Sequence, residues 1–226
     1  MKKRDSLYFE KLEDNFQNWA SGYDEKAREN LINQLLFPIP RTYMRCLEVG
    51  CGYGRMTRVY KHFFNEYIAS DISADLCRKT AEENNVLAKI EDALNLSIED
   101  NYFDCVISSE CIEHTTAPLK AIEEMARVVR PGGKLVFTTP NLTWHPILVL
   151  SQLLKLRKFR GNENWISAGQ TVNVLRKANF ESIKVLGCHL FPWQIPGAKI
   201  ILPYFDKIKW LRPFMINFGI SAIKKS

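Results

Sequence analysis

The sequence is poor in the features that mark membrane-spanning or disulfide-rich proteins. Its longest apolar stretch, Pro146–Leu156, is broken by polar residues and is too short to cross a bilayer. The six cysteines form no C-x-x-C pair, and several fall in segments expected to be buried strands, so we expect reduced thiols. The first residues are charged with no apolar run behind them, which argues against a signal peptide. Together these absences favour a cytoplasmic protein.

Acidic residues are scarce in the last third of the chain. Residues 141–226 hold 13 Lys and Arg against three acids, a balance of +10, whereas the whole chain carries +6. Such a basic third fits an anionic substrate or an anionic membrane surface, and a solvated basic face without a partner fits equally well.

The first 140 residues alternate between short apolar runs and segments with helical spacing. At 226 residues and 46% hydrophobic content, the chain is long enough to bury a full core. The succession predicts a parallel sheet covered by helices on both faces. The expected strands are 44–49, 66–70, 87–90, 103–108 and 134–140, and the expected helices between them are 55–64, 74–84 and 118–129.

The pattern differs at both ends of this region. Two helices are expected ahead of it, over 7–19 and 25–37, and the second ends before Pro38. After Pro140 the sequence predicts helices over 145–156, 171–178 and 199–211 and strands over 181–187 and 217–225. The two late strands suggest an antiparallel addition at one end of the sheet.

A glycine-rich turn, Gly50-x-Gly52-x-Gly54, follows the first predicted strand. Such a turn lets the backbone approach a ligand closely at the carboxyl edge of the sheet. The dinucleotide fingerprint would place a small residue where Arg55 stands, so a bound pyrophosphate is disfavoured. Glu48 argues the same way, because a carboxylate is a poor neighbour for phosphate and a good one for an ammonium group.

Glu48 and this turn resemble the first motif of the class I S-adenosylmethionine-dependent methyltransferases, an acid followed by G-x-G-x-G. Four further segments follow in the family's order: Asp71 at the end of the second strand, then residues 90–96, 103–115 and 127–141. The resemblance covers roughly residues 20–190. It implies an α/β, Rossmann-like fold with a seven-stranded, mostly parallel sheet in the order 3-2-1-4-5-7-6. The last strand would be antiparallel, with helices on both faces and a helical acceptor lid.

The resemblance also implies a single domain with S-adenosylmethionine as cofactor. Residues 1–40 would be N-terminal helices, 41–140 the cofactor-binding core, and 141–226 the acceptor lid with the closing strands. Asp71 would hold the ribose hydroxyls, since both oxygens of a carboxylate accept hydrogen bonds, and Asp92 would contact the adenine. The full set of expected cofactor-binding residues is Glu48, Gly50, Cys51, Gly52, Gly54, Asp71, Ile72, Asp92, Ala93 and Ser109.

The catalytic candidates are Glu110, Glu113 and His114, just after the fourth predicted strand. Their E-x-x-E-H pattern resembles the ubiquinone-biosynthesis O-methyltransferases and, more distantly, small-RNA 2′-O-methyltransferases, in which the three residues would match ligands of a divalent metal. Ala117 stands where the small-RNA enzymes have a further histidine, so a metal is possible but not expected. His114 as a general base or acceptor-orienting residue is the other role, and a purely structural cap of the loop also stays open.

Tyr23 is similar to an N-terminal element that closes over the cofactor in many relatives, and a helix-end aromatic packed on the core fits as well. His145 and His189 fall in the acceptor region, whereas His62 is expected on the surface.

The predicted function is methyl transfer to a small-molecule acceptor, an oxygen of a hydrophobic or anionic metabolite. Peripheral membrane contact by residues 199–214 is a further option, although two prolines make a poor interfacial helix and its apolar side is expected to pack on the domain. The aromatic residues that suit an apolar acceptor are Trp144, Phe159, Trp165, Phe191, Trp193, Tyr204, Phe205, Trp210 and Phe214.

Two alternatives remain. An RNA ribose methyltransferase would use the basic third as an electrostatic footprint. Base methylation is disfavoured because residues 108–111 read SSEC and lack the Pro-Pro-aromatic tetrad, and nucleic acid is not the expected partner. A non-catalytic binding subunit of the same fold is disfavoured by the intact cofactor residues.

Overall fold

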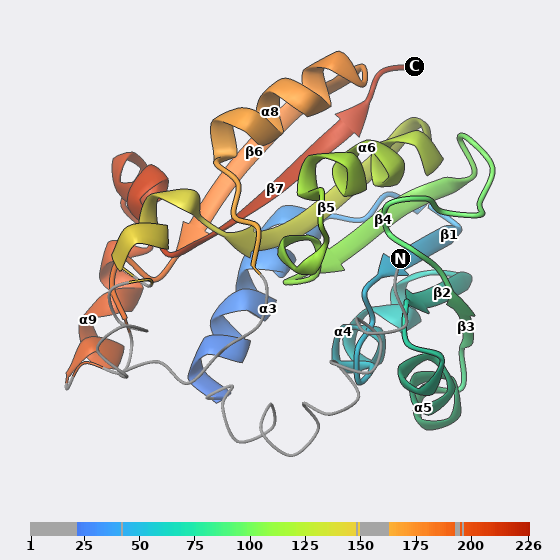
Figure 1. Ribbon diagram of the computed structural model, residues 1–226, viewed down its shortest axis with the longest axis horizontal. Helices are drawn as coiled ribbons and strands as arrows, with labels where there is room; N and C mark the ends of the chain where they lie inside the picture. The colour runs from blue at the N-terminus through green and yellow to red at the C-terminus, as the bar shows by residue number, and fades with distance from the viewer. Residues whose placement is uncertain (1–21, 42, 148, 150–162, 193–194, 196) are drawn as a thin grey trace.

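The computed structural model describes residues 22–41, 43–147, 149, 163–192, 195 and 197–226 (Figure 1). The helix predicted over 7–19 lies outside these residues, as does most of the helix predicted over 145–156. The predicted acceptor lid includes residues 150–162, which are also outside them.

A seven-stranded sheet runs through the described part of the chain, in the predicted order β3-β2-β1-β4-β5-β7-β6. β7 is antiparallel to both of its neighbours, and the remaining strand pairs are parallel. The prediction of the sheet is therefore confirmed. The strands are β1 Arg45–Val49, β2 Glu66–Asp71, β3 Leu87–Ile90, β4 Phe103–Ser109, β5 Val129–Pro140, β6 Phe180–Cys188 and β7 Asn217–Lys224.

Helices pack on both faces of this sheet (Figure 1). On one face Ile122 and Met125 of α6 and Leu175 of α8 join the buried cluster that contains Leu47 and Val49 of β1. The other face is covered by α3 and α4, whose apolar side chains are buried with alternate residues of the same strands. The helices are α3 Gly22–Leu36, α4 Arg55–Tyr60, α5 Ala74–Asn84, α6 Pro118–Val128, α8 Ala168–Lys177 and α9 Ala198–Phe205.

Short 3-10 segments extend several of these elements. η1 Lys61–Phe63 continues α4, η2 Ile112–His114 follows β4, and η3 Leu142–Trp144 follows β5. The predicted ends of the early strands and helices fall within a few residues of these bounds, because apolar spacing marks an element more clearly than its ends.

β5 begins at Val129, five residues ahead of the predicted strand 134–140, and includes residues 130–133. The register between β4 and β5 shifts between Phe103 and Cys105, so the strand begins at Val129 and passes through an irregularity. Gly133 lies so close to the neighbouring strand that a Cβ atom would stand 2.9 Å from the carbonyl oxygen of Asp104. Gly133 therefore allows the two strands to approach closely, and Gly132, with a φ of 73°, accommodates the irregularity.

The single helix predicted over 199–211 is wrong. α9 ends at Phe205, Ile208 is extended with a ψ of 107°, and η4 Lys209–Phe214 follows. Pro203 lies inside α9, so the break at residues 206–208 comes after the proline, where the chain turns extended before η4. Two short helical pieces therefore replace one amphipathic helix.

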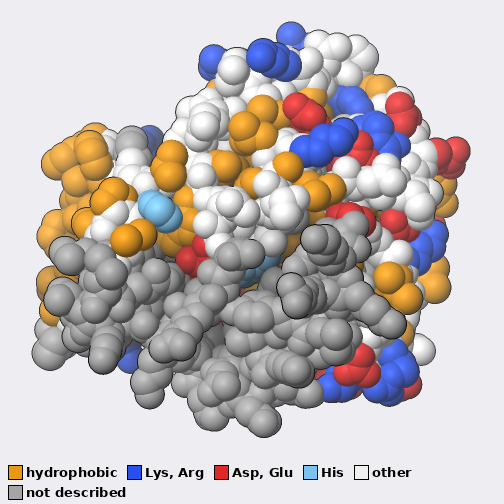
Figure 2. Space-filling view, viewed as in Figure 1, with side chains coloured by type: hydrophobic (Ala, Val, Ile, Leu, Met, Phe, Trp, Pro, Cys, Tyr) orange, Lys and Arg blue, Asp and Glu red, His pale blue; other side chains and the backbone are white. Residues whose placement is uncertain are grey.

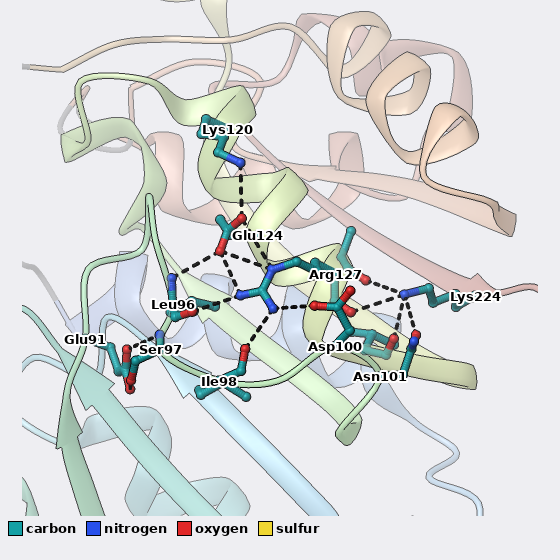
Figure 3. Close-up of polar contacts among 12 residues, drawn as sticks. Glu91, Leu96, Ser97, Ile98, Asp100, Asn101, Lys120, Glu124, Arg127 and Lys224 are labelled. Atoms are coloured by element: carbon teal, nitrogen blue, oxygen red, sulfur yellow. Dashed lines mark hydrogen bonds and ion pairs between the residues drawn. The ribbon is translucent and has the colours of Figure 1, made fainter.

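An arginine on α6 anchors the segment between β3 and β4 (Figure 3). Arg127 donates hydrogen bonds of 2.7–2.9 Å to Asp100, to Glu124 and to the carbonyl oxygen of Leu96. Glu124 in turn accepts a bond from the N–H of Leu96 at 3.1 Å. The segment that carries two of the predicted cofactor residues is thereby held against α6.

In the described part of the chain, no helix combines the length and apolarity that crossing a bilayer requires. The six cysteines all lie within it and form no disulfide.

Candidate active site

The glycine-rich turn adopts a conformation that only glycine accepts easily. Gly50, Gly52 and Gly54 have φ values of 78°, 50° and 69°. A Cβ atom on Gly50 would lie 2.2 Å from the sulfur of Cys111, and one on Gly54 would lie 2.4 Å from an amide nitrogen of Asn84. A Cβ atom on Gly52 would meet nothing within 4 Å. Two of the glycines therefore let the turn pack on the protein, while the third faces open space that a ligand fits.

Asp71 joins the end of β2 to this turn. One of its carboxylate oxygens accepts the N–H of Gly52 at 3.0 Å, and the other accepts the N–H of Ser73 at 3.0 Å. The hydroxyl of Thr80 also donates to the carbonyl oxygen of Gly52 at 2.9 Å. Burial raises the pKa of Asp71. Each carboxylate oxygen has a second lone pair, so Asp71 retains the capacity to accept hydroxyl donors from a ribose.

The side chain of Glu48 is buried among residues of α4 and β2. Its carboxylate accepts hydrogen bonds from the hydroxyls of Thr57, in α4, and Tyr67, in β2. Burial raises the pKa of Glu48 to about 7. The carboxylate thus fixes the first turn of α4 against the sheet, and its expected contact with an ammonium group stays a prediction.

The other predicted cofactor residues follow the carboxyl ends of β2, β3 and β4, which meet at one edge of the sheet. After β3, the N–H of Glu91 bonds to the carbonyl oxygen of Asp71 at 3.0 Å, and Asp92 accepts the N–H of Leu94 at 2.9 Å. Ser109 at the end of β4 lies 3.1 Å from the hydroxyl of Thr138. The remaining three are Cys51, which is buried, Ile72, which is half-buried, and Ala93, which is buried.

Beyond β4, Glu113 is buried and Glu110 is half-buried. Glu110 has a φ of 50°, and its carboxyl group accepts a hydrogen bond of 3.0 Å from the amide of Asn217. Glu113 accepts a hydrogen bond of 3.1 Å from the hydroxyl of Thr139. Burial raises the pKa of both carboxyl groups to about 8. His114 is more open, and its Nε2 lies 4.0 Å from Glu113 Oε1.

These three residues do not form a metal centre. Nη1 of Arg28 lies 3.6 Å from the carboxyl oxygen of Glu110, where a cation would be repelled. Glu110 and Glu113 face different partners, and among the described residues no group of three or more His, Cys, Asp or Glu side chains is placed to hold a metal ion. The residues present therefore do not fit a divalent metal.

Sequence reasoning missed a polar network that joins α3 to the same edge of the sheet. Arg28 pairs with Asp24 at 2.7 Å, and Asp24 Oδ1 lies 3.1 Å from Nε2 of His189. Asp24 and His189 are both buried. A signal was present, because Asp24 and Arg28 continue the buried stripe of α3 that also carries Leu31 and Leu35 at helical spacing. A charged pair in an apolar stripe indicates a buried partner.

The aromatic and histidine candidates are spread over several surfaces. Tyr23 lies against His189, with ring centroids 5.5 Å apart, and its closing role over the cofactor stays a prediction. The ring of His145 lies 5.7 Å from that of Trp165. His62 is exposed on η1, as predicted.

Comparison with known proteins agrees with this geometry. Residues 47–137 match the family described as a methyltransferase domain. An uncharacterized protein of Methanocaldococcus jannaschii is 29% identical over 75% of this chain and 82% of its own length. The ubiquinone biosynthesis O-methyltransferase of Cereibacter sphaeroides is 22% identical over 80% and 79%. The ubiquinone/menaquinone biosynthesis C-methyltransferase of Vibrio cholerae is 33% identical, but the match covers only 45% of this chain and 44% of that protein.

A solved structure shares the fold along nearly the whole chain. The S-adenosylmethionine-dependent methyltransferase of Thermotoga maritima, described as a possible histamine N-methyltransferase, superposes with a TM-score of 0.70. It covers 98% of this chain and 100% of its own, at 18% sequence identity. The open glycine turn, the acid that ends β2, the sheet order and these likenesses lead to one conclusion: the chain has the Rossmann-like fold of S-adenosylmethionine-dependent methyltransferases, and its residues 47–137 form a methyltransferase domain.

Proposed function

We propose that this methyltransferase transfers the methyl group to an oxygen of a small hydrophobic or anionic molecule. The observation that carries the proposal is the packing of the glycine turn on the E-x-x-E-H segment, where a Cβ atom on Gly50 would lie 2.2 Å from the sulfur of Cys111. Cys111 stands between Glu110 and His114, so the polar side chains lie beside the cofactor turn.

Bound S-adenosylmethionine supplies an activated methyl group, and the chain provides binding, orientation and exclusion of water. Alignment of the acceptor can contribute about 7–11 kcal/mol to lowering the barrier. An oxygen acceptor also has to lose its proton. With pKa values raised to about 8 by burial, Glu110 and Glu113 are mostly neutral near pH 7. His114 is then the residue suited to accept the proton, while the neutral carboxyl groups donate hydrogen bonds that orient the acceptor or the imidazole.

The proposed acceptor is supported more by the amino-acid composition of the last third of the chain than by similarity to known proteins. The named relatives act on carbon, oxygen or nitrogen, so none of them fixes the acceptor atom. The aromatic and basic residues of the last third suit an apolar or anionic molecule. The proposed alternative is an RNA ribose methyltransferase, and the same basic residues would then contact phosphates.

The proposal is tested by methyl transfer assays with His114→Ala on phenolic, amine and RNA acceptors. We expect transfer to a phenolic oxygen, with the variant slowed about 10²–10⁴-fold, the contribution typical of general acid–base catalysis. The matched control is His62→Ala, on the surface of η1, which should retain full activity. Transfer only to RNA or to amines, or an unaffected His114→Ala variant, would overturn this assignment.

Cofactor binding is measured separately by calorimetry with S-adenosylmethionine. Asp71→Ala should weaken binding strongly, because it removes the acceptor for both the turn and the ribose, whereas Asp75→Asn in the first turn of α5 should not.

A further inference from the structure

Helix α9 has apolar side chains on two of its faces, and only one face is covered. Ala198 and Leu202 point toward the core and are buried. Ile200, Ile201 and Tyr204 lie on another face and are 73%, 46% and 70% exposed. The expectation that the apolar side of this segment packs on the domain therefore holds for half of the helix only.

The exposed apolar surface continues beyond α9. Trp210 and Phe214 of η4 are 73% and 58% exposed, and Ile195, just ahead of α9, is 49% exposed. We call this surface, made of Ile195, Ile200, Ile201, Tyr204, Trp210 and Phe214, the α9–η4 face. Figure 2 shows hydrophobic side chains gathered at the upper left edge of the molecule, level with the red helical turn that precedes β7 in Figure 1. Exposed apolar side chains concentrated in this way mark an interaction site.

The same stretch of the chain is basic. Residues 195–214 contain Lys199, Lys207, Lys209 and Arg212 against one acid, Asp206. The carboxylate of Asp206 points inward, where it accepts the backbone N–H of His189 at 2.9 Å.

A groove of about 510 Å³ opens beside the face, and Lys26, Lys207 and Arg212 are among the residues that line it. Exposed apolar side chains on a basic stretch of chain, beside a groove to which three cations contribute, are complementary to an anionic surface that has an apolar interior.

We propose that the α9–η4 face rests on an anionic lipid bilayer, with the aliphatic and aromatic side chains in the interface and the cations of the same stretch on the lipid headgroups. Interfacial helices bind by apolar burial together with attraction to anionic lipids, and tryptophan and tyrosine prefer the headgroup level. A second copy of the chain fits less well, because a two-fold contact would bring the same cations against each other.

The face is also connected to the proposed acceptor side. Nε1 of Trp144, in η3 directly after β5, donates to the carbonyl oxygen of Phe214 at 2.6 Å. The bond from His189 to Asp206 joins the turn after α9 to the polar network near Glu110. An apolar acceptor could then reach the site directly from the bilayer, and this step rests on the proposed function. The docking of the face on lipid does not depend on that function.

Vesicle flotation tests the docking without any acceptor. The full chain should float with vesicles of phosphatidylcholine mixed with phosphatidylglycerol, bind phosphatidylcholine alone much more weakly, and be released by salt. Ile200→Ser with Tyr204→Ser, and Trp210→Ser separately, should weaken binding at least tenfold. Lys207→Glu and Lys209→Glu should each weaken it about fivefold or more, since each cation near an anionic surface contributes about 1 kcal/mol.

Matched controls lie elsewhere on the molecule. Leu87→Ser removes an apolar side chain that is 56% exposed on β3, at the other end of the sheet, and Lys225→Glu reverses an exposed cation. Both controls should float like the unmodified chain, and all variants should keep its melting temperature and its affinity for S-adenosylmethionine.

Absence of flotation, equal loss in the Leu87→Ser control, or binding that ignores lipid charge would each overturn the proposal. Sedimentation of the unmodified chain as a dimer that Trp210→Ser dissociates, without vesicle binding, would assign the face to a second copy instead. Loss of methyl transfer with intact flotation would count against the proposed function alone.

Discussion

At the scale of single residues, the site is defined by carboxyl groups that the fold has buried. Glu48, Glu110 and Glu113 all have raised pKa values, and burial is the main cause in each case. Each accepts a hydrogen bond from a neutral hydroxyl or amide donor, and Glu110 also lies near Arg28. Oε1 of Glu110 is buried and has no hydrogen-bond partner among the described residues. Burial therefore raises the pKa of each carboxyl group into the neutral range, so each remains partly or mostly protonated near pH 7.

The first prediction concerns Glu48. Its folded pKa of about 7 exceeds the ordinary value of 4.5, so its contribution to stability is fully present below pH 4.5 and is lost as the pH rises to about 7. The free energy of unfolding should fall by about 2–4 kcal/mol across that window from this group alone. The free energy of unfolding is measured with urea at pH 5 and at pH 8. Its change between the two pH values should be smaller in Glu48→Gln than in the unmodified chain, by about that amount. An unchanged difference would mean that Glu48 ionises freely.

The second prediction concerns Arg28, which links Asp24 to Glu110. Arg28→Gln leaves the buried Asp24 carboxylate without its guanidinium, and breaking such a pair costs about 3–5 kcal/mol. The cation also lowers the pKa of Glu110, so its loss should move any alkaline limb of the methyl transfer rate to higher pH. Arg28→Lys is the control that keeps the charge. Stability equal to that of the unmodified chain would contradict the burial of this network.

At the scale of elements, the segment between β3 and β4 shows how a loop is made stiff enough to position a ligand. It lacks regular structure, yet Arg127 and Glu124 on α6 bind its backbone from one side (Figure 3). Helices and strands usually provide such rigidity. Here helix α6 holds the neighbouring segment in place through hydrogen bonds between its side chains and the backbone of Leu96.

Removing that support should affect both stability and cofactor binding. Arg127→Ala should cost about 2–3 kcal/mol, in line with hydrogen bonds to charged groups, and should weaken S-adenosylmethionine binding because Asp92 and Ala93 lie on the same loop. Thermal melting and calorimetry provide the two readouts. Lys120→Ala removes only the exposed partner of Glu124 and should cost under about 1 kcal/mol. Equal effects of the two substitutions would contradict the role given to Arg127.

Elements with strong apolar spacing were predictable, and those fixed by neighbours were not. α5 and β3 have the predicted bounds, because Ser73 caps the helix and both segments carry their own pattern. β5 begins earlier than its apolar pattern predicts, because Val129 also pairs with Phe103 of β4 across an irregularity at residues 130–133. The apolar spacing of segment 199–211 predicts one amphipathic helix, yet the chain is extended at Ile208 and forms two short helical pieces.

At the scale of the whole molecule, the cofactor side of the site could be predicted and the acceptor side only in part. Glu48, the glycines and Asp71 belong to local motifs with fixed spacing. Asp24 and His189 are 165 residues apart in the sequence, so their contact is visible only in the fold. The exposure of the apolar side chains of α9 could not be predicted either. The sequence pattern shows that these side chains are apolar, but it does not show whether another part of the fold covers them.

The sheet order has a consequence for how the chain is made. β6 precedes β7 in the sequence but lies outside it in the sheet, so β6 finds its hydrogen-bonded neighbour only after β7 has left the ribosome. Asn217, which holds Glu110, is the first residue of β7. During synthesis β1 to β5 can therefore assemble first, and the edge of the sheet formed by β7 and β6 is completed in one late step.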